Sequence, residues 1–230
     1  MRSKLFLLFK VISIVSFSQS VQNNISGDGR MNTVLRFNGD IISNIKPDNI
    51  AGTPLLFDSW DTGYVKFNGN RIAHHVPLQF NLTDNTVYFQ KDNNRYKFVD
   101  RVIEFSFSKK VNNEYQQFLF RSNYPLNGNY TDLVFYKVEA ENEEVQFLKY
   151  CIKKIRENYV HNAPSEKEYH YREELFLYLT KSKSFHPVSN KKSILAALPQ
   201  YRQRIEELCE KNKWSLKEPA QIAQLVRQLK

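Results

Sequence analysis

Turn-forming residues recur at short, regular intervals through the middle of this chain, and no other feature of the sequence limits its fold as much. Between residues 55 and 139, short runs of alternating apolar and polar residues are separated by turns about every eight to twelve residues. Parallel strands would need helical crossovers, and this stretch has no helical pattern. The predicted fold class is mainly β with C-terminal α, an antiparallel meander that forms a curled sheet or a partly open barrel. Three of the turns are rich in Asn, Asp or Gly: Asn68-Gly69-Asn70, Thr83-Asp84-Asn85 and Asp92-Asn93-Asn94.

The expected strands are rich in aromatic residues, which favour strands and bury large areas. The chain has 17 Phe and 13 Tyr, so a packed β-rich domain is expected. Residues 145–155 fit both a strand and a helix. The strand is favoured, paired with residues 169–180, with an exposed loop at 161–167. The other predicted strands span residues 64–67, 71–75, 76–82, 86–91, 95–99, 102–107, 115–121 and 133–139.

The C-terminal segment has helical periodicity. Asn190 is placed to cap a helix over residues 191–198, and Pro199 ends it. A second helix is expected over residues 200–213. Two to three short helices should therefore cap the sheet.

The last helix has both a start signal and an apolar stripe. Ser215 and Glu218, three residues apart, fit a capping box. A stripe at helical spacing predicts that this helix packs on the domain. The stripe consists of Ile222, Leu225, Val226 and Leu229.

The N-terminus has the pattern of a secretory signal. Arg2 and Lys4 precede an apolar stretch, and small residues stand before Val21, where cleavage is expected. Lys10 interrupts the apolar stretch, and a buried N-terminal strand or helix is the alternative. A permanent anchor is less favoured, since a spanning helix needs about 20 apolar residues. The chain is thus expected to be exported, to the periplasm or cell envelope if bacterial and otherwise secreted.

Four segments follow from these patterns. The N-terminal lead holds a strand pair that turns at Asn38-Gly39. The predicted division is a signal peptide at 1–20, this lead at 21–50, a β-rich domain at 51–188 and a helical segment packed on it at 189–230.

Charge is distributed unevenly along the chain. Residues 149–230 carry 17 Lys and Arg against nine Asp and Glu, whereas residues 21–148 carry 13 against 15. Because an exported protein rarely meets nucleic acid, the basic half suggests peripheral contact with anionic lipid head groups or an acidic partner. Ordinary solvated helix faces explain the same excess. Cys151 and Cys209 are expected to be two buried thiols rather than a disulfide, which an oxidising compartment would permit.

The sequence shows no convergent catalytic or metal-binding motif. No Gly-x-Ser-x-Gly elbow, His-Glu-x-x-His motif, Cys-x-x-Cys pair or phosphate-binding Gly-rich loop occurs. His74 and His75 are adjacent in an expected strand, so they should point to opposite faces and share no ligand. We therefore expect no enzyme activity, cofactor or metal.

The most unusual local string is Asp58-Ser59-Trp60-Asp61. A Trp flanked by carboxylates fits a recognition site that stacks on a sugar or holds a cation. Asp is also common in turns, and Trp60 can close the end of a sheet. Asp58, Trp60 and Asp61 are therefore either a recognition site or a structural turn, and the turn is favoured.

Several stretches resemble secreted cell-envelope proteins of Bacteroidota, a group without an established activity. Residues 52–58 and 63–69 resemble their opening, and residues 78–89 resemble a following strand and turn, with Phe80 where Tyr is expected. Residues 191–195, 204–206 and 211–213 resemble their closing helices. The resemblance implies an exported envelope domain and transfers no catalytic residue.

These patterns lead to one functional expectation and one alternative. The first is a non-catalytic exported envelope protein, a binding or interaction module that contacts another protein or an apolar or anionic envelope component. The alternative is a carrier, in which the curled aromatic-lined sheet holds a lipid or another apolar ligand.

Overall fold

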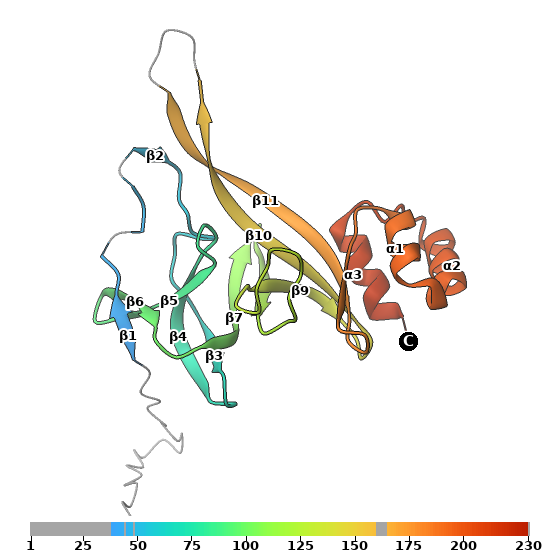
Figure 1. The fold of residues 1–230 in the computed structure, drawn as a ribbon, viewed down its shortest axis with the longest axis horizontal. Helices are drawn as coiled ribbons and strands as arrows, with labels where there is room; N and C mark the ends of the chain where they lie inside the picture. Colours follow the sequence, from blue (N-terminus) through green and yellow to red (C-terminus); the bar gives the residue numbers. More distant parts are fainter. Residues whose placement is uncertain (1–37, 44, 48, 160–164, 230) are drawn as a thin grey trace, which may run out of the picture. The chain divides into compact units, whose positions relative to one another are not determined.

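The structure is a computed structural model that describes residues 38–43, 45–47, 49–159 and 165–229. These residues belong to one compact unit, 36–230. The described strands form one mainly antiparallel sheet that is not closed, and three short α-helices follow it (Figure 1). The predicted class, mainly β with C-terminal α, is confirmed.

The strands follow one another across the sheet with few exceptions. Their order is β1-β6-β5-β4-β3-β7-β8-β9-β10-β11-β12, and β2 pairs in parallel with β11. The strands are β1 (Gly39–Ile41), β2 (Ile50–Ala51), β3 (Asp61–Phe67), β4 (Ile72–Asn81), β5 (Thr86–Lys91), β6 (Asn94–Phe98), β7 (Val102–Val111), β8 (Glu114–Arg121), β9 (Tyr136–Glu141), β10 (Val145–Asn158), β11 (Glu166–Leu179) and β12 (Ser184–Pro187). The helices are α1 (Lys191–Ala197), the 3-10 helix η1 (Pro199–Tyr201), α2 (Arg202–Asn212) and α3 (Pro219–Gln228).

The predicted hairpin turns are confirmed by their backbone angles. Asp92 and Asn93, between β5 and β6, have φ of 48° and 61°, which suits a two-residue turn between twisted strands. The turn between β7 and β8, with φ of 50° at Asn112 and 68° at Asn113, escaped the sequence analysis. At the other two predicted turns, Gly69, Asn70 and Asn85 also have positive φ angles.

One face of the sheet, called the inner face, carries a cluster of Phe rings over β4, β7 and β8. Phe105 and Phe120 are fully buried and stack with centroids 4.8 Å apart, because the antiparallel register places them directly opposite each other. Phe57, from the segment before β3, packs edge-on against Phe118 at 5.1 Å. Alternation along each strand sends the neighbouring polar residues to the opposite face.

The long β10–β11 hairpin confirms the strand interpretation of residues 145–155. Its strands, 14 residues each, pair without interruption from Val145–Leu179 to Asn158–Glu166. At 133–139 the prediction was partly wrong, because β9 begins only at Tyr136. The backbone N–H of Phe135 instead donates to Asn85 Oδ1 at 2.7 Å.

The C-terminal helices pack on the inner face at β9, β10 and β11. Ile194, Ile205 and Leu225 are fully buried and join Phe147 and Leu177 in one core cluster. Asn142, in the β9–β10 turn, donates from Nδ2 to the carbonyl oxygens of Val226 at 2.8 Å and Leu229 at 2.9 Å. The helices are therefore an integral part of the described fold.

Helix starts agree with the sequence at α1 and differ at α3. Asn190 caps α1, and its Oδ1 accepts from the N–H of Ser193 at 3.0 Å. The capping box predicted at Ser215 is wrong, because α3 begins at Pro219 with Glu218 as N-cap and no side-chain cap. Gln221 Oε1 instead accepts from the N–H of Leu216 at 2.8 Å.

The N-terminal predictions are only partly visible. Gly39 lies in β1, which pairs with β6, and its φ is not positive, so the tight turn expected at Asn38-Gly39 is wrong. The signal peptide and the strand expected before Asn38 lie outside the described residues.

Two further observations concern the cysteines and membrane spans. Cys151 and Cys209 are both free and buried, as expected. Among the residues that the structure describes, no helix combines the length and apolar character needed to cross a membrane.

Candidate functional site

The segment predicted as a recognition site or structural turn is attached to the sheet at two separate points. Asp61, the first residue of β3, pairs with Lys109 of β7 through an Nζ–Oδ1 distance of 3.0 Å. Ser59 Oγ donates to Asp61 Oδ2 at 3.1 Å, and Lys109 also donates to Ser59 Oγ. Asp61 therefore fixes the entry of the chain into the sheet.

Trp60 and Asp58 belong to a different cluster, on the face opposite the Phe rings. The Arg95 guanidinium lies 5.4 Å from the centroid of the half-buried Trp60 ring and 5.9 Å from that of Tyr88. Gln79 connects Asp58 to Arg95, since its Nε2 donates to the Asp58 carbonyl at 2.6 Å and its Oε1 accepts from Arg95 Nη2 at 2.8 Å. Burial lowers the pKa of Arg95. The three predicted residues thus do not converge on one point.

Asp58 also lines an open hollow of about 530 Å³, together with Thr53, Leu55 and Arg95. Lys153 reaches the same segment from β10, where its Nζ donates to the carbonyl oxygens of Thr53 at 3.0 Å and Leu55 at 2.6 Å. Backbone acceptors satisfy this cation, so the contact holds the segment against the sheet.

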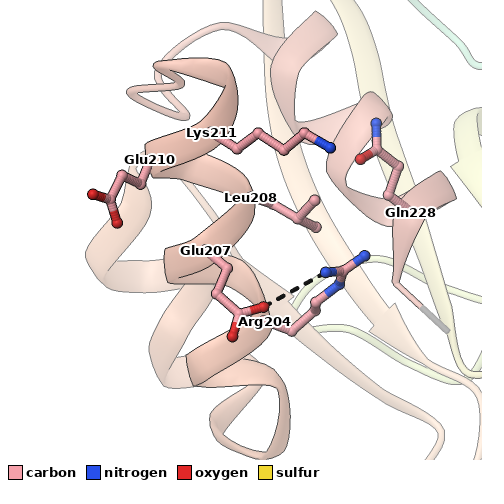
Figure 2. Close-up of a pocket in the computed structure, with 6 residues that line it drawn as sticks. All are labelled: Arg204, Glu207, Leu208, Glu210, Lys211 and Gln228. Atoms are coloured by element: carbon pink, nitrogen blue, oxygen red, sulfur yellow. Dashed lines mark ion pairs between the residues drawn. The ribbon is translucent and has the colours of Figure 1, made fainter.

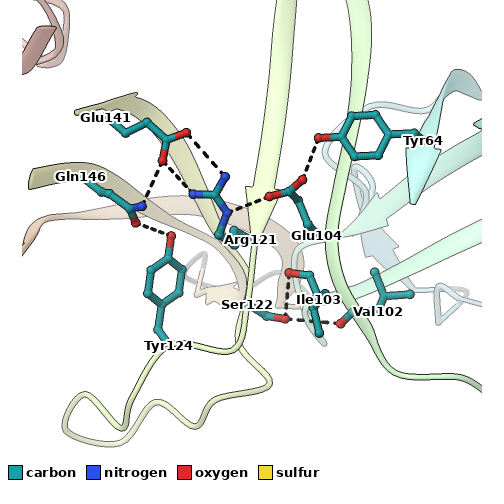
Figure 3. A network of polar contacts seen from close by, with 9 residues as sticks. All are labelled: Tyr64, Val102, Ile103, Glu104, Arg121, Ser122, Tyr124, Glu141 and Gln146. Carbon is teal, nitrogen blue, oxygen red and sulfur yellow. Dashed lines mark hydrogen bonds and ion pairs between the residues drawn. The ribbon is translucent and has the colours of Figure 1, made fainter. Parts of the chain in front are cut away.

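A larger constellation occupies the face opposite the Phe cluster, which we call the polar face. It is defined by Tyr64 on β3, Glu104 on β7 and Arg121 on β8, joined into one network (Figure 3). Tyr64 OH donates to Glu104 Oε1 at 2.8 Å, and Arg121 Nε donates to Glu104 Oε2 at 2.7 Å. The side chains of Arg121 and Glu104 are only 27% and 16% exposed.

The network continues onto the C-terminal strands (Figure 3). Arg121 Nη1 donates to Glu141 Oε2 at 2.8 Å. Gln146 of β10 donates to the same oxygen at 3.0 Å and accepts from Tyr124 OH at 2.7 Å. Each side chain thus holds the next in one orientation. Side chains ordered in this way would lose little conformational entropy on binding a ligand.

Burial and pairing set the protonation states of this network. Burial lowers the pKa of Arg121, but the hydrogen bonds that it donates to Glu141 and Glu104 outweigh burial and raise the pKa overall. Burial and the hydrogen bond to Glu104 raise the pKa of Tyr64 to about 12. Burial likewise raises the pKa of Tyr124. The guanidinium is therefore charged and the phenols neutral at ordinary pH.

Two hollows open on the polar face, one on each side of the Tyr64–Glu104 hydrogen bond. The first, of about 240 Å³, is lined by Lys66, Glu104, Arg121 and Gln146, among others. The second, of about 210 Å³, is lined by Tyr64, both adjacent histidines and a group of small polar side chains: Thr62, Ser106, Ser108 and Gln117.

A β-bulge brings the two histidines to the second hollow. Gly63 pairs with Val76 and Val65 pairs with Ala73, so Tyr64 faces both His74 and His75 across the strand pair. His75 has φ of 57°. The prediction that the two rings point to opposite faces was wrong, because alternation is interrupted at a bulge.

The strands are unusually close beside this bulge. A Cβ atom added to Gly63 would lie 1.9 Å from the carbonyl oxygen of Ser106, so only glycine fits there. A left-handed His75 and an obligatory glycine on neighbouring strands are local strain of the kind that concentrates at binding sites.

Metal binding finds no support in the described part of the chain. No group of three or more His, Cys, Asp or Glu side chains is arranged there to hold an ion. Glu104, the carboxylate bonded to Tyr64, already accepts from Arg121. The bulge histidines therefore lack a third ligand among the described residues.

The basic excess predicted for the C-terminal half lies partly on exposed α2. Figure 2 shows Arg204 and Lys211 beside a shallow hollow of about 440 Å³ with Leu208 between them. Arg204 pairs with Glu207 at 3.5 Å, and Glu210 points away from the hollow (Figure 2). The cations are thus mixed with carboxylates on this helix.

The hollow most relevant to a carrier lies between β5, β6 and residues 131–135. It measures about 360 Å³ and includes Val87, Phe98 and Phe135, but also Asp84 and Asp100. The Phe rings of the inner face contact one another closely. The aromatic lining that the carrier hypothesis requires is therefore largely occupied by its own side chains.

Comparison with protein-family models, curated proteins and solved structures finds no match for this chain. The resemblance to envelope proteins of Bacteroidota therefore stays a prediction, and function must be argued from the geometry.

The sequence analysis missed the Tyr64–Glu104–Arg121 network. The available signal was the polar side of each alternating strand, where Glu104 and Ser106 share one face of β7. To join these residues, one must know which strands lie beside β7. The sequence does not show that β3 pairs with β7, because other strands separate the two along the chain.

Proposed function

We propose that this chain is a non-catalytic binding module exported to the cell envelope, and that it recognises its ligand through the polar face. The observation that carries this proposal is the interlocked network of Tyr64, Glu104 and Arg121 between two hollows. Preformed polar groups beside aromatic rings are typical of binding sites. Export rests on the basic start and apolar stretch of residues 1–20.

A binding role suits these side chains better than chemistry. Catalytic acids and bases need a pKa close to the working pH, whereas the pKa of Tyr64 is about 12 and the charges of Glu104 and Arg121 are paired. Cys151 is buried, and burial raises the pKa of its thiol, which makes it a poor nucleophile.

Native mass spectrometry of the protein purified from its source tests the proposal. We expect a retained molecule that is lost in Tyr64→Ala, because this change removes both the ring and the hydroxyl group bonded to Glu104. Tyr159→Ala is the matched control, since Tyr159 is 82% exposed on the β10–β11 hairpin. A retained molecule that is unaffected by Tyr64→Ala would contradict the assignment of the polar face.

The carrier is the second candidate, and the 360 Å³ hollow beside Phe98 and Phe135 favours it. The same experiment separates the two. A lipid that is retained by Tyr64→Ala and lost in Val87→Lys would support the carrier. A molecule lost only in Tyr64→Ala would support the polar face.

A further inference from the structure

The charges around the first hollow of the polar face balance. Lys66, Arg121 and Glu104 line it, and Glu141, which is paired with Arg121, brings the total to two cations and two carboxylates. An anionic ligand would be repelled by the carboxylates, and a cationic ligand by the two cations. In either case the cost of removing water from the ligand's charge would not be offset by net electrostatic attraction. The hollow therefore favours a neutral ligand.

The side chains around this hollow have both donors and acceptors that are not used within the network. Arg121 donates to Glu104 and Glu141 through Nε, Nη1 and Nη2, which leaves further N–H groups on its guanidinium. Both carboxylates keep acceptor capacity beyond these bonds. A hydroxyl group donates and accepts at once, so a ligand with several hydroxyl groups matches this surface better than an apolar group does.

The second hollow offers a similar surface with aromatic rings. Gln117 is fixed between two hydroxyl groups, because Ser108 Oγ donates to its Oε1 at 2.6 Å and its Nε2 donates to Ser106 Oγ. The rings of Tyr64 and His74 lie beside it, with centroids 6.1 Å apart. A pyranose ring has a C–H face that packs on aromatic rings and a rim of hydroxyl groups for Gln117.

From these observations, and resting on the proposed function, we infer that the ligand is a neutral saccharide chain. It lies across β3, β7 and β8, with one sugar in each hollow and the Tyr64–Glu104 hydrogen bond between them. The pair of adjoining hollows suits a polymer rather than a single sugar. The β-bulge at His75 shapes the second hollow by turning both His74 and His75 toward it.

Affinity gel electrophoresis with dextran, amylopectin, xylan and mannan tests this inference, with polygalacturonate as the anionic comparison. We expect at least one neutral polysaccharide to retard the protein and polygalacturonate not to do so. Gln117→Ala should weaken the binding about tenfold, equivalent to about 1.4 kcal/mol. Gln116→Ala is the matched control, because Gln116 is the exposed neighbour on the opposite face of β8, and its affinity should stay within about twofold of the wild type.

The results separate the saccharide from the broader proposal. Retardation by none of the neutral polysaccharides, or by polygalacturonate alone, overturns the inference, as does an unchanged affinity in Gln117→Ala. If the molecule lost in Tyr64→Ala is instead a protein, the proposed function stands and the saccharide is wrong. Circular dichroism checks that both variants fold, and Tyr64→Phe, which keeps the ring and removes only the hydroxyl group, replaces Gln117→Ala if that variant does not.

Discussion

On the inner face of the sheet, aromatic side chains contact other aromatic rings, whereas on the polar face they also need hydrogen-bond partners. Phe105 and Phe120 stack at 4.8 Å with no polar atom to satisfy. Across the sheet, Tyr124 donates to Gln146 and Tyr130 donates to Glu174 at 2.9 Å. Buried hydroxyl groups without partners are costly, so Tyr124 and Tyr130 each connect two parts of this face through a hydrogen bond.

Under the proposed function, this difference assigns stability to the inner face and ligand recognition to the polar face. The inner face can be packed by apolar side chains of suitable volume and is covered by the helices at its β9–β11 end. The polar face keeps its side chains oriented even where they reach the two hollows. A binding surface on a sheet can thus be built opposite the core, with the core as its rigid support.

High pH should break the polar face, whose buried phenols ionise, whereas the Phe cluster of the inner face has no group to titrate. Burial raises the pKa of Tyr64, Tyr88 and Tyr136 to about 12, against about 10 in an unfolded chain. The unfolded chain therefore releases these protons first, so stability is complete below about pH 10 and is lost as the pH rises to about 12. We expect unfolding in this window, followed by circular dichroism and phenolate absorbance.

The alkaline transition has its own control. Tyr136→Phe removes one of the ionising groups and should move the midpoint to higher pH. A fold that persists unchanged through pH 12 would show that these phenols do not couple to unfolding.

Truncation of the Phe cluster tests the inner face. Phe120 is fully buried, with ring centroids 4.8 Å from both Phe80 and Phe105. Phe120→Ala should lower the free energy of unfolding by about 3 to 5 kcal/mol, because it leaves a cavity between packed rings. Urea denaturation measures this, and Leu126→Ala, at a side chain 75% exposed, should stay within about 0.5 kcal/mol of the wild type.

The attachment of the helices to the inner face should depend on Asn142. Its Nδ2 donates to two carbonyl groups at the end of α3, and its Oδ1 accepts from the N–H groups of Glu144 and Val145. Asn142→Ala should cost about 2 kcal/mol, since several bonds of roughly 0.5 to 1.5 kcal/mol are lost together. Amide exchange should become faster across α3.

The control for Asn142 is an Asn that joins only the hairpin strands. Asn158 donates to Glu168 at 2.9 Å at an exposed position, so Asn158→Ala should leave exchange in α3 unchanged. Equal effects of the two substitutions would show that Asn142 has no special role in holding the helices.

The inner face could be predicted from the sequence far better than the polar face. Alternation and turn chemistry locate strands such as β5 and β7 within a few residues, since both signals are local. The two predicted helix caps had different outcomes for the same reason. Asn190 caps the helix that directly follows it. Ser215 does not cap α3, because Leu216 is fully buried and its N–H donates to Gln221.

The polar network depends on strand register, which local patterns do not contain. Arg121 meets Glu104 because β7 and β8 pair directly, and Tyr64 meets Glu104 only because β3 lies on the other side of β7. The bulge at His75 inserts an extra residue into β4, which period-two alternation does not predict. The predicted string of Asp58, Trp60 and Asp61 is divided between the two faces of the sheet, because Trp60 and Asp61 point to opposite faces.

The smallest predicted effect on stability comes from removing a single oxygen atom on the polar face. Tyr124→Phe removes a hydroxyl group and keeps the ring, which packs against Tyr178 with centroids 4.9 Å apart. In the Phe cluster of the inner face such a change has no counterpart, since Phe has no hydroxyl group to lose. Here Gln146 Oε1 loses its donor, so urea denaturation should show a loss of about 1 kcal/mol.

Tyr115→Phe is the matched control for this variant, because Tyr115 is 80% exposed and removing its hydroxyl group should leave stability unchanged. A Tyr124→Phe variant as stable as the wild type would mean that ring packing alone holds the polar face together. The two faces would then differ only in their hydroxyl groups, and the network would be free to serve ligand binding without contributing to the fold.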